Sequence, residues 1–304
     1  MLSPLRGEDR RVSGGGGQIA LIGCFATPHP PIIVPEVGGA QLAEADATVR
    51  AMQVVREKTA ALSPDTIVLL SPHAYLVARK MGVSLASSYR GSLAYFRAPR
   101  VVVEAAGDQT LARAIMERAA EHGVPVAETA SLGEAVDLDD DHGATVPLVY
   151  LLGGLERPCR LVLLAFSQLD LREHARFGVA VGEALLEASE RVLYVASSDL
   201  SHRLLPGGPY SFDPRGIEFD RLVADTFAGG DWEGLLSIDP GVVAAAGECG
   251  YRSLAVLSGV VAAAEAGGAR TENHLLSYEG PFGVGYLVGE VKITEASEKL
   301  ETAR

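Results

Sequence analysis

The chain has 304 residues, of which 48% are hydrophobic and 21% charged, with a formal net charge of −13, so it can bury a substantial core in one large domain or two small ones. The acidic balance disfavours a nucleic-acid-binding protein, which needs a basic face, and it disfavours attraction to an anionic membrane. Cys24, Cys159 and Cys249 are sparse and far apart, and no apolar stretch reaches membrane-spanning length, so we predict a cytoplasmic protein without a disulfide framework.

The chain opens with polar residues 1–17, which lack the apolar segment of a signal peptide and predict a flexible leader. Short apolar segments typical of buried strands then alternate with segments whose apolar residues recur at helical spacing. The predicted strands cover residues 18–26, 66–70, 160–165, 192–196 and 284–293, with a strand-and-turn region over 82–104. The predicted helices cover residues 39–62, 111–122, 143–152, 171–190 and 254–264.

This alternation predicts a single-domain three-layer α/β/α sandwich around a mixed, largely parallel sheet over residues 18–293. Residues 294–304 form a charged tail that we place outside the domain. Pro147 falls early in one predicted helix, where we expect it within the first turn because proline is tolerated there.

Histidines are the most informative residues of the chain. Five of the seven lie in short, turn-rich contexts: His29, His73, His142, His202 and His274. At least two of them, His73 and His202, directly follow buried strands. Ligands of layered α/β sheets bind outside the carboxyl ends of the strands, at a topological switch point. The sequence therefore predicts a ligand or metal site at this edge of the sheet.

A nonhaem ferrous site needs two neutral imidazoles and one carboxylate on the same side of the metal. His29 and His73 are the best imidazole pair, because both lie in proline-stiffened loops after apolar strands. Glu248 is the sharpest candidate for the carboxylate, since a charge between an alanine run and a glycine needs a partner. A glutamate that stabilises a helix N-terminus explains Glu248 equally well. Cys249 is a rival ligand, whose thiolate would favour a softer metal such as copper or zinc.

Acid–base chemistry is assigned to His202 and His142. Asp199 precedes His202 and could orient its ring or raise its basicity, although a simple Asp/Ser turn is the alternative. The acidic stretch before His142 contains Asp137, Asp139, Asp140 and Asp141. It could form a hard-cation site, although its spacing does not match a known calcium loop, or it could equally form a solvated loop. The other histidines lack strand-end settings: we expect His122 and His174 on helix surfaces and His274 at a structural or site-rim position.

At these residues the sequence resembles the class III extradiol ring-cleavage dioxygenases, in the LigB-like superfamily that also contains the Memo-like proteins. The resemblance spans most of residues 18–293, and its pieces follow the family's order. They are Pro28-His29-Pro30-Pro31, Ser71-Pro72-His73, Asp141-His142-Gly143-Ala144-Thr145-Val146-Pro147-Leu148 and Ser198-Asp199-Leu200-Ser201-His202.

The resemblance implies Fe(II) held by His29, His73 and Glu248, with zinc, copper or manganese as alternative metals. It also implies that His202 is the acid–base residue and that His142 contacts substrate or oxygen. The partners it implies are a small aromatic substrate and O2, in a homodimeric protein.

We therefore expect an Fe(II)-dependent extradiol dioxygenase. The runner-up is a Memo-like metal-binding or interaction protein without ring cleavage, because Memo-like relatives carry a cysteine in a Cys-Gly context where this chain has Cys249-Gly250. A zinc-dependent hydrolase that uses the same cleft is a third reading.

Overall fold

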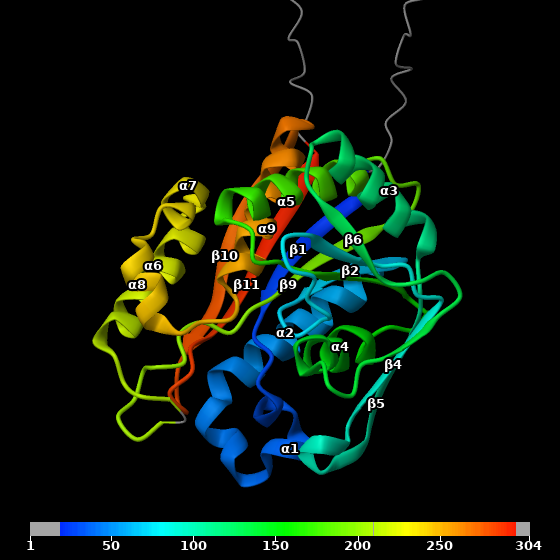
Figure 1. The fold of residues 1–304 in the computed structure, drawn as a ribbon. Helices are drawn as coiled ribbons and strands as arrows, with labels where there is room; N and C mark the ends of the chain where they lie inside the picture. The colour runs from blue at the N-terminus through cyan, green and yellow to red at the C-terminus, as the bar shows by residue number, and fades with distance from the viewer. Residues whose placement is uncertain (1–18, 209, 296–304) are drawn as a thin grey trace, which may run out of the picture.

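The computed structural model describes residues 19–208 and 210–295, so the expected leader and all but the first two residues of the expected tail lie outside the described residues. Its core is an eight-stranded sheet in the order β10-β11-β1-β9-β2-β8-β3-β6 (Figure 1). The strands are β1 (Leu21–Thr27), β2 (Thr66–Ser71), β3 (Met81–Ser84), β6 (Val126–Ala130), β8 (Arg160–Ala165), β9 (Val192–Ser197), β10 (Ala269–Glu279) and β11 (Tyr286–Glu295).

The middle of the sheet is parallel, because β9 pairs in parallel with β1 and β2, and β2 also pairs in parallel with β8. Antiparallel pairs occur between β10 and β11, β11 and β1, and β3 and β8. The prediction of a mixed, largely parallel sheet is therefore confirmed. A smaller three-stranded sheet contains β4 (Ser88–Leu93), β5 (Ala98–Ala106) and β7 (Ala135–Asp137), and a short helix, η3 (Ala94–Phe96), joins β4 to β5.

Helices cover both faces of the large sheet (Figure 1). One face packs against α2 (Asp46–Leu62) and α4 (His142–Gly153). The other packs against α3 (Gln109–Glu121), α5 (Leu171–Leu186), α6 (Pro214–Gly229) and α9 (Tyr251–Ala266). The remaining helices are short: η1 (Pro31–Ile33), α1 (Pro35–Gly38), η2 (Gly39–Ala45), α7 (Trp232–Leu236) and α8 (Pro240–Ala246).

The strands supply both layers of the core because successive side chains point to opposite faces. In β1, Cys24 and Ala26 belong to the cluster under α5 and α9, whereas Phe25 belongs to the cluster under α2 and α4. This double burial explains why the central strands are continuous apolar runs in the sequence. Within the described residues, the structure contains no helix that is both long and apolar enough to traverse a bilayer.

The helix expected over residues 39–62 and the expected tail both differ from the structure. The helix expected over residues 39–62 is divided, because η2 ends at Ala45 and α2 begins at Asp46. Strand β11 continues through Thr294 and Glu295, the first two residues of the expected tail. These residues pair with Arg270 and Ala269 of β10, a strand that the sequence analysis did not predict.

Candidate metal centre

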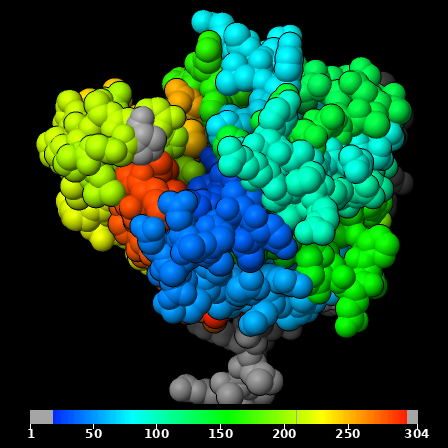
Figure 2. Space-filling view, turned by 90° about the horizontal axis from the view of Figure 1, so that it is seen from below, coloured from blue at the N-terminus to red at the C-terminus, as the bar shows by residue number. Residues whose placement is uncertain are grey.

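The candidate site lies where the parallel strands β1, β9 and β2 end. Each strand runs into a loop that carries a histidine: His29 follows β1, His73 follows β2 and His202 follows β9. Because neighbouring parallel strands place their carboxyl ends at one edge, the three loops meet there. Figure 2 looks at the molecule from below Figure 1, and it shows N-terminal segments (blue) between C-terminal strands (orange-red) and cyan to green segments from the middle of the chain.

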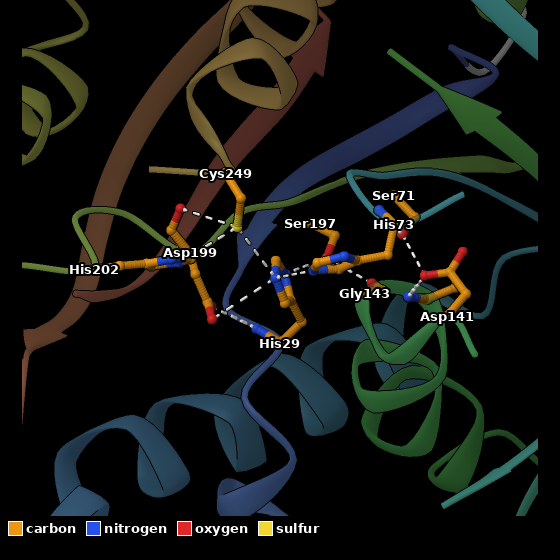
Figure 3. A network of polar contacts seen from close by, with 10 residues as sticks. His29, Ser71, His73, Asp141, Gly143, Ser197, Asp199, His202 and Cys249 are labelled. Atoms are coloured by element: carbon orange, nitrogen blue, oxygen red, sulfur yellow. Dashed lines mark hydrogen bonds and ion pairs between the residues drawn. The ribbon is translucent and has the colours of Figure 1, made fainter. Parts of the chain in front are cut away.

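Three side chains of residue types that can bind a metal converge at this edge (Figure 3). His29 Nε2 lies 3.2 Å from His73 Nε2 and 3.5 Å from Cys249 Sγ. One ligand atom from each of the three residues lies within 4.8 Å of the others. Two imidazole nitrogens and a sulfur form a donor set that suits a transition metal such as zinc, copper or iron. The residues therefore fit a single metal ion.

Burial shifts the pKa values of the three side chains, and these shifts set the protonation states in which they would meet a cation. It is the largest cause of a lowered pKa at His29, which is fully buried, and the neighbouring histidines lower that pKa further. Burial also lowers the pKa of His73. Both rings are therefore neutral near pH 7, which is the form that binds metals. Burial raises the pKa of the Cys249 thiol, so the thiol keeps its proton until a cation displaces it.

Glu248, the expected third ligand, does not join this group. Its Oε2 accepts a hydrogen bond from the backbone N–H of Tyr251 at 2.6 Å, so the carboxylate stabilises the start of α9. The alternative ligand, Cys249, faces the histidines instead. Gly250 permits this arrangement, because a Cβ there would lie 2.5 Å from the Cα of Ser198 and 2.6 Å from the carbonyl oxygen of Asp199.

The two histidines assigned to acid–base chemistry lie beside the three ligand candidates. The His142 ring stacks on His73, with centroids 4.2 Å apart, and burial followed by the charge of His73 lowers its pKa to about 4. His202 Nε2 lies 3.6 Å from Cys249 Sγ, and burial lowers the pKa of His202 as well. The structure therefore brings both of these neutral imidazoles to the site, His142 beside His73 and His202 beside Cys249.

Asp199 has a different neighbour from the one expected. Its Oδ1 accepts a hydrogen bond of 2.8 Å from the backbone N–H of His29, and its Oδ2 lies 3.7 Å from His29 Nε2. Within residues 19–208 and 210–295, no hydrogen bond joins Asp199 to His202. Burial raises the pKa of Asp199 to about 7, against the opposing effect of the His29 amide. Asp199 therefore positions the His29 loop rather than the His202 ring.

Ser71 and Asp141 also support the site, and the sequence analysis assigned neither a role in it. The Ser71 hydroxyl donates a 2.6 Å hydrogen bond to Asp141 Oδ1 and accepts the backbone N–H of His73. Asp141 also accepts the backbone N–H of Ala144 and so caps α4. Burial raises the pKa of Asp141 to about 6. The last residue of the acidic stretch is thus a buried link between the His73 loop and α4, not part of a solvated loop.

Two aromatic side chains complete the surroundings of the histidines. Tyr210, which is half-exposed, stacks on His202 with ring centroids 5.1 Å apart. Phe96, from the tip between β4 and β5, meets the ring of His142 edge-on at 5.6 Å. No spacing in the sequence identifies either residue, because only the fold brings η3 and the segment with Tyr210 beside the histidines.

The other histidines lie apart from the ligand group. His122 is the C-cap residue that follows α3, and its Nε2 lies 2.8 Å from Glu183 Oε2; the side chain is partly exposed, as expected. The expectation of a surface position for His174 is wrong: it is fully buried, and its Nε2 accepts the backbone N–H of Ser167. His274 lies in β10 and contacts Glu272 at 3.2 Å.

The chain is similar to known proteins in sequence and in fold. A family model described as the catalytic LigB subunit of aromatic ring-opening dioxygenase matches residues 23–289. Protein CA_C1420 of Clostridium acetobutylicum is 35% identical over 273 residues, which cover 89% of this chain and 57% of that protein, so the chain spans little more than half the length of this relative. The crystal structure of the uncharacterized protein JW3007 of Escherichia coli K12 is similar in fold, with a TM-score of 0.60 and 17% identity over 88% of this chain and 99% of that one.

Proposed function

The chain belongs to the LigB family of catalytic subunits of aromatic ring-opening dioxygenases, and from that premise we propose that it is an Fe(II)-dependent extradiol dioxygenase. In this proposal His29, His73 and Cys249 hold the metal, and a catecholic ring is opened next to its diol with both atoms of O2. The observation that carries the proposal is the convergence of these three ligand atoms within 4.8 Å at the carboxyl edge of the sheet.

The bound Fe(II) would supply a Lewis-acidic, redox-active centre at which the diol and O2 meet, which removes much of the entropy cost of their encounter. The chain's own residues would orient the substrate and move its protons. His202 is neutral, and its Nε2 lies 3.6 Å from Cys249 Sγ, so this nitrogen is placed to take a hydroxyl proton from the substrate. His142, stacked on His73, is a second neutral imidazole at the same centre.

The aromatic neighbours of these histidines suit a planar substrate. Tyr210 lies against His202 and Phe96 lies against His142, so an aromatic face and an aromatic edge flank the two bases. Aromatic rings favour such offset and edge-on contacts by about 0.5–1.5 kcal/mol beyond simple burial. This arrangement supports an aromatic rather than an aliphatic substrate.

A second candidate function rests on Cys249. A thiolate in place of the carboxylate of a ferrous facial triad favours a softer metal such as copper or zinc. Cysteine at this position is the feature that the sequence shares with Memo-like proteins, so the second candidate is a metal-binding protein of the same fold without ring cleavage.

One experiment separates the two candidates. The protein is reconstituted anaerobically with Fe(II), mixed with a panel of catechols, and exposed to O2, with oxygen uptake and the yellow ring-opened product as readouts. The proposal expects stoichiometric oxygen uptake and product with at least one catechol. No turnover across the panel, combined with tight copper binding that Cys249→Ala abolishes, would reject the dioxygenase and support the second candidate.

A further inference from the structure

Ser197, the last residue of β9, contacts the Nδ1 atom of His29, whereas His73 and Cys249 face its Nε2 atom (Figure 3). Its Oγ lies 2.9 Å from His29 Nδ1 and 2.6 Å from the carbonyl oxygen of Gly143. All three residues are buried, so water does not compete for these contacts.

The directions of the two hydrogen bonds follow from their chemistry. A carbonyl oxygen can only accept, and two oxygens at 2.6 Å need a hydrogen between them. The single hydrogen of the Ser197 hydroxyl therefore points to Gly143. The hydroxyl can then act only as an acceptor toward His29, so His29 Nδ1 must carry its proton.

Pro147 explains why the Gly143 carbonyl is available. In an α-helix this carbonyl would accept the N–H of the residue four positions later, which here is Pro147. Proline has no N–H, and its ring pushes that carbonyl outward. Pro147 was expected in the first turn, but α4 begins at His142 and places it in the second. The Ser197 hydroxyl donates to the carbonyl that Pro147 deprives of its usual partner four residues later.

We propose that Pro147, Gly143 and Ser197 form an orienting relay that holds His29 in its Nδ1–H tautomer. In this tautomer the lone pair is on Nε2, the atom that faces His73 and Cys249. Ser197 is a positioning residue, because it acts on the metal position through His29. The expected increase in metal affinity rests on the proposed function. The tautomer of His29 does not depend on that function.

The relay makes the two histidine ligands unequal. In the part of the chain that the structure describes, no side-chain hydrogen bond reaches Nδ1 of His73. The tautomer of His29 is thus fixed before a metal binds, whereas His73 can adopt either tautomer when the metal binds. Removing the partner of a metal-binding histidine lowers metal affinity by about 10–100-fold in other proteins, which sets the expected size of the effect here.

The test compares Ser197→Ala with two matched variants. Ser197→Thr keeps the hydroxyl, and Ser198→Ala removes the next hydroxyl along the chain, which is buried and has no hydrogen-bond partner among the described residues. The ring nitrogens of the metal-free proteins are assigned by long-range 15N–1H NMR at pH 8, and Co(II) affinity is measured by competition titration.

We expect the Nδ1–H tautomer of His29 in the wild type, Ser197→Thr and Ser198→Ala, and a mixture of tautomers in Ser197→Ala. Co(II) should bind about 10–100-fold more weakly to Ser197→Ala alone. An Nε2–H tautomer in the wild type, or an unchanged tautomer and affinity in Ser197→Ala, would overturn the relay. If Ser197→Ala fails to fold, the tautomer of His29 in the wild type still tests the relay. A wild type that binds no Co(II) but shows the Nδ1–H tautomer would reject the metal centre and leave the relay standing.

Discussion

Gly143→Ala tests how tightly the His73 loop packs against α4. Gly143 is the second residue of α4, and a Cβ built there would lie 2.5 Å from Ser71 Oγ and 2.9 Å from His73 Cδ2. Ser71 cannot move freely, because its hydroxyl is bonded to Asp141. The methyl group must therefore displace the imidazole of His73 or the start of the helix.

Two opposing effects determine the stability of this variant. Alanine is favoured over glycine inside a helix by about 1 kcal/mol. Inserting a methyl group into a packed site costs about 1–3 kcal/mol, and contacts this short lie toward the upper end of that range. We therefore expect a net loss of about 1–2 kcal/mol, together with a drop of roughly tenfold or more in Co(II) affinity as His73 is displaced.

Gly153→Ala is the matched control, because it adds the same methyl group to the same helix. The nearest atom there is Arg56 Cζ at 3.7 Å, an ordinary contact, so this variant should be as stable as the wild type or more stable. Urea unfolding and Co(II) titration of both variants provide the measurements. The packing argument is refuted if Gly143→Ala matches Gly153→Ala in stability and the wild type in Co(II) affinity.

Three further predictions concern the surroundings of the site. Burial raises the pKa of Asp220 from 3.8 to about 7, so between these values the folded protein binds a proton that the unfolded chain has released, and stability falls as the pH rises. Asp199 and Asp141 contribute a fall of the same sign in both proteins. Between pH 5 and pH 8 the loss measured by urea unfolding should therefore be roughly 2–3 kcal/mol smaller in Asp220→Asn than in the wild type, and equal pH slopes would contradict this. Glu248→Gln should bind Co(II) with an affinity within about threefold of the wild-type value, because the Glu248 carboxylate stabilises the start of α9 instead of binding metal. A larger loss of Co(II) affinity would show that Glu248 is a ligand. Tyr210→Ala should raise KM for a catechol by about 2–10-fold while Co(II) affinity stays constant, and an unchanged KM would remove Tyr210 from the substrate site.

The sequence was sufficient to predict the layered fold and the edge at which the histidines gather. Buried parallel strands are readable as apolar runs, as in 66–70 and 192–196, and the residues after them must share one edge. The sequence therefore predicts that His29, His73 and His202 lie together.

The third ligand could not be decided in the same way. Glu248 and Cys249 are neighbours on one turn and point in different directions. Which of them faces His29 depends on the close approach of Gly250 to Ser198, a contact across 52 positions of the chain. Local sequence carries no signal of that approach.

Ser197 was missed for a related reason. A serine that ends an apolar run looks like an ordinary buried strand residue. The available clue was Pro147, four residues after Gly143, since it implies a carbonyl that needs a donor from elsewhere in the fold. Only the structure shows that this donor is Ser197.

X-ray absorption at the metal edge of the Fe(II)-loaded protein shows whether the metal centre has one sulfur ligand. We expect a sulfur scatterer at about 2.3 Å, the distance typical of metal–thiolate bonds, together with imidazole nitrogens. The sulfur signal should disappear in Cys249→Ser and persist in Glu248→Gln. A wild-type spectrum with nitrogen and oxygen scatterers alone would contradict the assignment of Cys249.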